Sequence, residues 1–167
     1  ILMTSNVASA KTAADIMSRG VVSIEATDSI QDAMQIMTEH HVSGVPVVDE
    51  KNRCIGVIST SDVVSFVEAD QEALEGQIPH TENWFNPDTQ KWEESMFSHE
   101  MLGEYDLVPV TDAMTNDPLT VHPQMPVVDV ARTMMEHSIH RVFVVNDAGQ
   151  LQGVISALDF VQLMAEG

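Results

Sequence analysis

Gly56-Val57-Ile58-Ser59-Thr60-Ser61-Asp62 returns later in the chain as Gly153-Val154-Ile155-Ser156-Ala157-Leu158-Asp159, with the glycine, the three residues after it and the aspartate unchanged. The match extends well beyond this stretch. Residues 14–67 align on residues 111–164 without a gap, and 15 of the 54 aligned positions are identical, which is more than scattered chance matches would give. Such a repeat indicates two copies of one packing unit, each of which needs a neighbour to bury its apolar surface.

The apolar pattern of each copy predicts the same order of elements, β-α-β-β-α. A short apolar stretch precedes a helix whose apolar residues recur at helical spacing, and two apolar strands follow around a polar turn. Asp28 or Ser29 is expected to cap the helix of copy 1, and Pro126 suits the first turn of its counterpart. The predicted strands and closing helix are residues 21–24, 45–48, 55–58 and 61–67 in copy 1, and residues 119–121, 142–145, 151–155 and 158–164 in copy 2.

The repeat divides the chain into copy 1 at residues 12–67, an insert at 68–108 and copy 2 at 109–165. The insert holds 11 of the chain's 26 acidic residues and both tryptophans, Trp84 and Trp92. The tryptophans flank an Asn-Pro-Asp turn signal, so we expect a small hairpin there. Two interpretations of the insert stay open: a partly ordered segment whose aromatic residues pack on the body or on a partner, or a solvated acidic linker. A divalent-cation site among its carboxylates is a further hypothesis.

The formal net charge of -19 at pH 7 argues against DNA, RNA or an anionic membrane surface as a partner, because those surfaces attract Lys and Arg. The sequence shows neither an apolar run of membrane-spanning length nor a signal peptide. The single cysteine, Cys54, can form no internal disulfide and aligns with Leu151, so we interpret it as a strand residue in a reducing compartment. We therefore expect a cytoplasmic protein.

The repeated Ser-x-x-Asp element follows an apolar strand and opens a helix, which permits two interpretations. As a capping box, the Ser hydroxyl accepts a hydrogen bond from a free backbone N–H, and the Asp carboxylate lies favourably in the first turn. As a binding site, the unpaired N–H groups and the positive end of the helix suit a phosphate, and the carboxylate can accept hydrogen bonds from two vicinal ribose hydroxyls. The second interpretation indicates a nucleotide.

The two copies together resemble a tandem pair of CBS domains, the regulatory Bateman module. The resemblance rests on Asp15-Ile16-Met17-Ser18 and Asp112-Ala113-Met114-Thr115, on the Val-x-Val-Val strands and on Gly-Val-Ile-Ser-x-x-Asp, all in order and twice. It implies an α+β fold in which two β-α-β-β-α repeats pack as a pseudo-two-fold pair, with the acidic insert between them in sequence. It also implies two clefts for an adenosine ligand, which would be AMP, ADP, ATP or S-adenosylmethionine, and no required cofactor.

The resemblance also implies roles for individual residues. Ser59 and Ser156 would contact phosphate, and Asp62 and Asp159 would hold ribose. Two segments just before the first strands would line the base, partly by main-chain groups. Their residues are Ser18, Val21 and Val22 in copy 1, and Thr115, Pro118 and Leu119 in copy 2.

The two copies differ where charge matters, because copy 2 has His140 and Arg141 where copy 1 has Ser43 and Gly44. The His-Arg pair resembles the phosphate-gripping pair in the gamma subunit of AMP-activated kinase, and Arg can make a bidentate contact to phosphate. We therefore predict that the copy 2 cleft prefers phosphorylated adenosine, and that the copy 1 cleft is weaker or empty. The alternatives are a solvated or acid-paired Arg141 and a packing role for His140.

Ser59 and Ser156 have no catalytic partner nearby in sequence, and the histidines show no metal-ligand spacing, so we predict no catalytic residue, no metal site and no enzyme activity. The predicted function is that of a regulatory sensor, in which ligand binding alters the packing of the repeats and regulates an attached domain or an unknown partner protein. A homodimer is expected, because members of this family often pair through their helices. The alternative is a ligand-free dimerisation or docking scaffold whose Ser-x-x-Asp elements are caps only.

Overall fold

The computed structural model describes residues 11–72, 82–86, 91–95 and 105–166, and for 71–72, 82–86 and 91–95 it describes the backbone. The chain divides into two compact units, and each is treated by itself. Unit 1 draws on residues 1–21, 51–54 and 119–167, and unit 2 on residues 22–50 and 55–118. Unit 2 therefore holds most of copy 1, and unit 1 holds most of copy 2.

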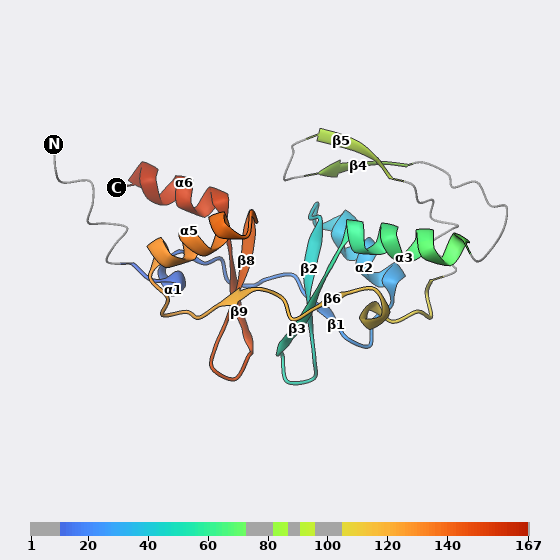
Figure 1. Cartoon of the computed structure of the whole chain (residues 1–167), viewed down its shortest axis with the longest axis horizontal. Coiled ribbons are helices and arrows are strands. Elements are labelled where there is room, and N and C mark those ends of the chain that lie inside the picture. The colour runs from blue at the N-terminus through green and yellow to red at the C-terminus, as the bar shows by residue number, and fades with distance from the viewer. Residues whose placement is uncertain (1–10, 73–81, 87–90, 96–104, 167) are drawn as a thin grey trace. The chain divides into compact units, whose positions relative to one another are not determined.

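Unit 2 is a four-stranded sheet with two helices beside it (Figure 1). The sheet order is β1-β2-β3-β6, with β1 parallel to β2 and β3 antiparallel to β6. Its core is formed by apolar side chains from the strands and helices, among them Ile24, Ile30, Val47, Ile58 and Val63. The elements are β1 (Ile24–Glu25), α2 (Ile30–Glu39), β2 (Gly44–Val48), β3 (Cys54–Ser59), α3 (Thr60–Glu72), the 3₁₀ turn η1 (Val110–Asp112) and β6 (Thr115–Asn116).

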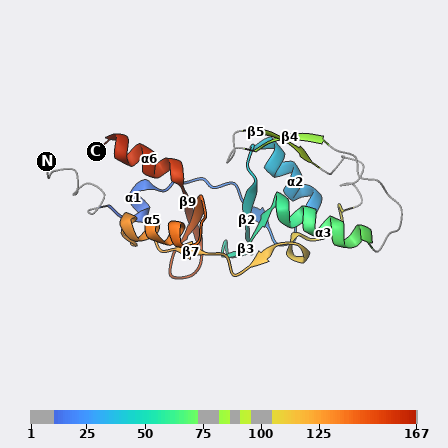
Figure 2. The same ribbon diagram turned by 45° about the horizontal axis from the view of Figure 1, so that its top comes forward.

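Unit 1 is a three-stranded sheet, order β7-β8-β9, and its two longer helices also lie on one side of the strands, which the turned view shows as well (Figure 2). Strand β7 is parallel to β8, and β8 is antiparallel to β9. Its core includes Ala13, Val130, Val144 and Ile155. The elements are α1 (Ala13–Ile16), β7 (Thr120–Val121), α5 (Val127–Glu136), β8 (Arg141–Val145), β9 (Leu151–Ser156) and α6 (Ala157–Glu166).

The order β-α-β-β-α occurs twice, as β1-α2-β2-β3-α3 and as β7-α5-β8-β9-α6, which confirms the predicted α+β fold. Ser29, rather than Asp28, is the N-cap of α2. The first strand of copy 1 is shorter than predicted: it begins at Ile24 instead of Val21, because the parallel register with β2 pairs only Ile24 and Glu25. In copy 2 the strand begins at Thr120 instead of Leu119, and both closing helices are longer than predicted.

The backbones of the two copies agree in detail as well as in order. Left-handed backbone conformations occur at matched positions of the repeat, although the residue types differ. Because such conformations are costly for residues with a Cβ, their recurrence at matched positions indicates one duplicated backbone design rather than similar sequences folded differently. The matched pairs are Gly20 with Asp117, His41 with Ser138, and Asn52 with Gly149.

Two strands of the insert, β4 (Glu82–Asn86) and β5 (Lys91–Ser95), pair antiparallel, which confirms the predicted hairpin pairing. The register sets Phe85 opposite Trp92 and Trp84 opposite Glu93, so the two tryptophans are not direct partners. Whether the insert packs on the body lies outside the described residues. Among the residues that the structure describes, no helix combines the length and apolar character needed to cross a membrane.

Candidate functional site

The two Ser-x-x-Asp elements lie at strand-to-helix corners, between β3 and α3 and between β9 and α6. At the first corner the backbone N–H and the hydroxyl of Ser59 both donate to Oδ2 of Asp62, at 2.9 and 2.8 Å. At the second, the same two groups of Ser156 donate to Oδ2 of Asp159, at 2.7 and 3.2 Å. At the first corner the Ser59 hydroxyl also accepts from the backbone N–H of Asp62 at 3.2 Å, which completes a capping box there. At both corners these bonds use one carboxylate oxygen of the aspartate, Oδ2.

The other carboxylate oxygen, Oδ1, differs between the corners. Oδ1 of Asp62 accepts a hydrogen bond from the hydroxyl of Thr115 at 3.1 Å. Within the part of the chain that the structure describes, no hydrogen bond to Oδ1 of Asp159 occurs. Both aspartates are half-buried, so an acceptor left over at this position is reachable by a ligand. The second corner therefore offers a carboxylate oxygen that accepts no hydrogen bond from the described residues.

A short segment precedes the first strand of each copy: residues 11–18 for copy 1 and residues 114–115 for copy 2. Each of these lead-in segments lies at the corner of the other copy. Thr115, which precedes copy 2, pairs with Val57 in the sheet of unit 2. Ser18, which precedes the first strand of copy 1, exchanges backbone hydrogen bonds of 2.9 and 3.0 Å with Val154 in unit 1. Of the base-lining residues predicted for each copy, Ser18 and Thr115 are thus brought to the opposite corner, an exchange that alignment of the two copies along the chain does not reveal.

The repeated glycine of Gly-Val-Ile-Ser is what permits this close approach. A Cβ at Gly56 would stand 2.6 Å from the sulfur of Met114 and 2.9 Å from the carbonyl oxygen of Thr115. At Gly153 the corresponding distances are 2.7 Å to the sulfur of Met17 and 2.8 Å to the carbonyl oxygen of Ser18. Real side chains do not approach so closely, so the glycine is required wherever a lead-in segment crosses the strand.

Asp159 borders a small polar hollow of about 120 Å³, whose other lining residues come from the lead-in segment and from α6. Lys11 supplies a positive charge to this lining. It was not predicted from the sequence, because Lys11 precedes copy 1 along the chain whereas the hollow lies at the corner of copy 2. Asp15 also lies here. Hydrogen bonds from the backbone N–H and the hydroxyl of Thr12, at 2.8 and 3.2 Å, hold the pKa of Asp15 below its ordinary 3.8, with a smaller contribution from the charge of Lys11. The remaining lining residues are Ile16, Gln162, Leu163 and Glu166.

Arg141 lies directly opposite Ser156 in the antiparallel pairing of β8 and β9. Residues that are directly opposite share one face of the sheet, so the half-buried Arg141 side chain and the Ser156–Asp159 cap belong to one corner. In copy 1 the same position is Gly44, where an added Cβ would stand 3.7 Å from Cβ of Ser59. The structure therefore brings Arg141, Ser156 and Asp159 together, and copy 1 has no counterpart of the arginine.

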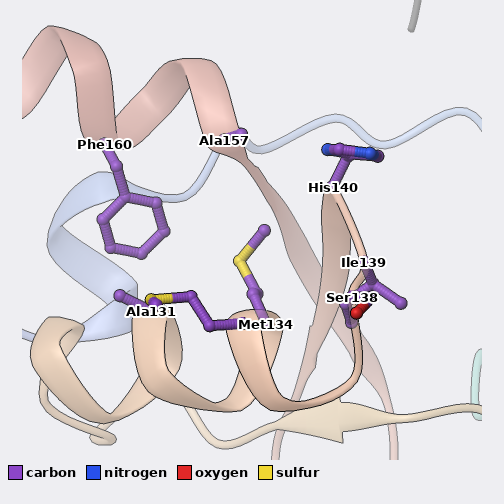
Figure 3. A pocket seen from close by; sticks show the side chains of 8 residues that line it. Ala131, Met134, Ser138, Ile139, His140, Ala157 and Phe160 are labelled. Carbon is purple, nitrogen blue, oxygen red and sulfur yellow. The ribbon is translucent and has the colours of Figure 1, made fainter.

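His140 is placed elsewhere. It lines an apolar hollow of about 440 Å³ between α5 and α6, where Met134 and Phe160 project toward each other (Figure 3). Its carbonyl oxygen accepts a hydrogen bond from the backbone N–H of Ala157 at 2.9 Å. His140 is not among the residues that line the hollow beside Asp159. The other lining residues of the apolar hollow are Ala131, Met135, Ser138, Ile139 and Ala157.

The other residues predicted to line the base are Val21, Val22, Pro118 and Leu119. Val22 packs on the core of unit 2, Val21 and Pro118 are half-buried, and Leu119 is 37% exposed. Within the described ranges, no group of three or more His, Cys, Asp or Glu side chains is placed to hold a metal ion.

Comparison with known proteins gives two matches to one family model, the CBS domain, at residues 13–69 and 110–166. An uncharacterised protein of Methanocaldococcus jannaschii, MJ1426, is 29% identical over 153 residues, which are 90% of this chain and 89% of that protein. The chloroplastic CBS domain-containing protein CBSX2 of Arabidopsis thaliana is 26% identical over 133 residues. The latter match covers 80% of this chain but only 54% of the plant protein.

Solved structures agree with these matches. The structure of CBSX2 in complex with AMP superimposes with a TM-score of 0.66 at 22% identity, and covers 93% of this chain and 97% of that one. The CBS domain pair of protein MJ0100, in complex with 5'-methylthioadenosine and S-adenosyl-L-methionine, gives a TM-score of 0.62 at 20% identity, with coverage of 93% and 97%. At these identities the likeness shows that the fold is shared.

Proposed function

The chain belongs to the CBS-domain family, and from this premise we propose that it is a regulatory sensor module that binds an adenosine-type ligand without transforming it. The observation that carries the proposal is the corner of copy 2, where Arg141 lies opposite Ser156 and where Oδ1 of Asp159 accepts no hydrogen bond from the residues that the structure describes. The relatives solved with AMP, and with 5'-methylthioadenosine and S-adenosyl-L-methionine, support adenosine as the shared part of the ligand.

In the proposed complex, the ribose diol donates to Asp159, and a phosphate lies beside Arg141 and Ser156, whose hydroxyl turns from Oδ2 of Asp159 to the phosphate. The net charge of -19 repels an anion at long range, so binding needs local cations. Arg141 is such a cation, and its planar guanidinium suits phosphate oxygens. Lys11, which lines the hollow beside Asp159, is a second. A phosphorylated adenosine is therefore expected to bind this corner more tightly than a neutral one.

Calorimetric titration of AMP, ADP, ATP and S-adenosylmethionine into the wild type and into Asp159→Ala tests the proposal. We expect Asp159→Ala to weaken binding at least tenfold, because the diol loses its charged acceptor. Asp147→Ala is the matched control: it removes an equal charge from a side chain that is 97% exposed. If Asp159→Ala is folded and binds as the wild type does, the ligand does not use the copy 2 corner.

A second candidate function, a ligand-free scaffold, is favoured by the hydrogen bonds within each Ser-x-x-Asp element. The Ser59 hydroxyl donates to Asp62 and accepts from its backbone N–H, and the Ser156 hydroxyl donates to Asp159, so both hydroxyls have partners within the chain. A thermal-shift panel separates the two functions, because a ligand that binds only the folded chain raises the midpoint of unfolding. Absence of a shift with every adenosine compound at millimolar concentration would favour the scaffold.

The expected homodimer has a candidate surface on α5 and α6. Four large apolar side chains there are strongly exposed: Met135 at 79%, Leu158 at 73%, Val161 at 60% and Met164 at 82%. Met135 also lines the apolar hollow, and Leu158, Val161 and Met164 share one face of α6 because they are three residues apart. Exposed apolar side chains gathered in this way mark an interaction surface. We propose that a second copy covers it. The regulated partner, the cytoplasmic location and the division at residues 12–67, 68–108 and 109–165 stay predictions.

A further inference from the structure

Two hydroxyl side chains occupy equivalent places at the two corners but bond differently. Thr115 and Ser18 align in the repeat, and each is held by backbone pairing to the strand before the corner, opposite Val57 and Val154. The hydroxyl of Thr115 donates to Oδ1 of Asp62 at 3.1 Å. In the described part of the chain, Ser18 makes no such bond to Asp159. Both residues pair antiparallel with the equivalent valine, Thr115 within the two-residue strand β6 and Ser18 in an isolated bridge, and their side chains differ by one methyl group.

We propose that Thr115 is a specificity-determining residue that reserves the copy 1 corner, and that the Thr115/Ser18 difference directs an adenosine ligand to copy 2. This inference rests on the proposed function. The Thr115 hydroxyl competes with the ligand, because it binds the carboxylate oxygen of Asp62 that a ribose diol needs.

The competition follows from the bonds around Asp62. Its Oδ2 already accepts two hydrogen bonds from Ser59. The Ser59 hydroxyl is itself committed: it donates to Asp62, accepts from the Asp62 backbone N–H at 3.2 Å and lies 2.9 Å from the hydroxyl of Ser61. A diol must therefore share Oδ1 with Thr115 or displace it. Displacement breaks a hydrogen bond to a charged group, which is among the stronger kinds in water.

The methyl group of threonine explains why Ser18 does not do the same. A β-branched side chain has few accessible χ1 rotamers, so Thr115 keeps its hydroxyl aimed at Asp62. Serine rotates more freely, and Ser18 is exposed. Asp159 then meets a ligand with one oxygen already available. Arg141 and its counterpart Gly44 favour copy 2 independently, through phosphate rather than through ribose.

The test uses AMP and reciprocal variants. In an Asp159→Ala background, which removes the copy 2 corner, Thr115→Val deletes the hydroxyl but keeps the shape of an exposed side chain. We expect this change to tighten AMP binding about tenfold, the factor for one such hydrogen bond. In the opposite direction, Ser18→Thr in the otherwise wild-type chain should weaken AMP binding about tenfold, because the new threonine hydroxyl would donate to Oδ1 of Asp159 as Thr115 donates to Asp62. Ser65→Thr makes the same change at an exposed position of α3 outside both corners, so it is the matched control and should leave affinity unchanged.

The outcomes separate this inference from the proposed function. The role of Thr115 is overturned, and the sensor function stands, if the wild type binds AMP but neither substitution changes the affinity of its parent. The parent of Thr115→Val is the Asp159→Ala variant, and the parent of Ser18→Thr is the wild type. If neither the wild type nor any variant binds AMP or the other adenosine compounds, both are overturned. A gain of binding in Thr115→Val together with a loss in Ser18→Thr supports both, provided that circular dichroism shows each variant to be folded.

Discussion

The sulfur of Met17 lies against the backbone of Gly153, so close that a Cβ at that glycine would stand 2.7 Å from it. Met114 stands in the same relation to Gly56. Each methionine belongs to a lead-in segment, and each glycine belongs to the strand that the segment crosses. The two identities Met17/Met114 and Gly56/Gly153, which are far apart in the alignment, thus form one repeated contact.

Gly153→Ala is therefore expected to destabilise the chain by about 1–3 kcal/mol, the usual effect of overpacking a tight contact. The carbonyl oxygen of Ser18, 2.8 Å from the added Cβ, is backbone and cannot swing away as a side chain would. Urea unfolding measures the change. Gly44→Ala is the control, because its Cβ would meet nothing nearer than 3.5 Å. Equal stability of the two variants would contradict the contact.

Ser29→Ala is expected to cost about 1 kcal/mol of stability. Ser29 is 7% exposed, and its hydroxyl accepts a hydrogen bond from the backbone N–H of Asp32 at 3.1 Å. In return, the backbone N–H of Ser29 donates to the Asp32 carboxylate at 3.0 Å. The alanine leaves the Asp32 N–H without its partner at the start of α2. Urea unfolding of Ser29→Ala and of the exposed Ser65→Ala provides the comparison, and a loss of similar size in both would argue against a capping effect.

Ser138→Gly is expected to stabilise the chain by up to about 1 kcal/mol. Ser138 has φ of 53°, a left-handed conformation that costs a residue with a Cβ more than it costs glycine. Part of the gain is offset, because glycine loses more conformational entropy on folding. Ser138→Ala keeps the Cβ and should change stability by no more than about 0.5 kcal/mol. A glycine variant less stable than the alanine variant would disprove the account.

Leu158→Asp should shift the proposed homodimer toward monomer, because it places a charge in an apolar surface that the second copy would cover. The matched control is Ser61→Asp, since Ser61 is the exposed counterpart of Leu158 in copy 1. Sedimentation velocity over a range of concentrations measures both. The surface is excluded as the dimer contact if Leu158→Asp remains as dimeric as Ser61→Asp.

The stability contributed by Asp15 should depend on pH in a defined direction. Its pKa in the folded chain lies below 3.8, so the contribution is complete above that pH and is lost as the pH falls through the folded pKa. Asp15→Asn should therefore be less stable than the wild type at pH 7, and the two should converge as the solution becomes strongly acidic. Thermal unfolding across this range, with exposed Asp106→Asn as control, checks the convergence.

The elements of the fold could be predicted because they depend on local signals. Apolar strands, a Ser cap before a helix and a polar turn lie within a few residues of one another, and the repeat shows each signal twice. β6 at Thr115–Asn116 was not predicted, since two residues carry little strand preference and their partner, β3, is distant in sequence. Strands this short are set by the surface available for pairing.

The candidate site was predictable in its residue types more than in its grouping. The Ser-x-x-Asp spacing identified both corners, whereas the position of Arg141 opposite Ser156 became visible only in the pairing of β8 and β9. The sequence order assigned Ser18 to copy 1 and Thr115 to copy 2, but the sheet pairing places them the other way. Lys11 escaped notice for the same reason. Only the tertiary pairing of the lead-in segments reveals which residues meet, and a single sequence holds no record of that pairing.

The exchange of lead-in segments also sets an order of events on the ribosome. Unit 1 is made of three segments, and all of unit 2 is synthesised before the longest of them, residues 119–167, begins. Domains tend to fold as they emerge, N-terminal parts first. Here the earliest described residues, from Lys11 to Ser18, must wait for strand β9 near the end of the chain. A nascent chain stalled before residue 119 would contain all of unit 2, but residues 11–18 would lack strand β9, on which they pair.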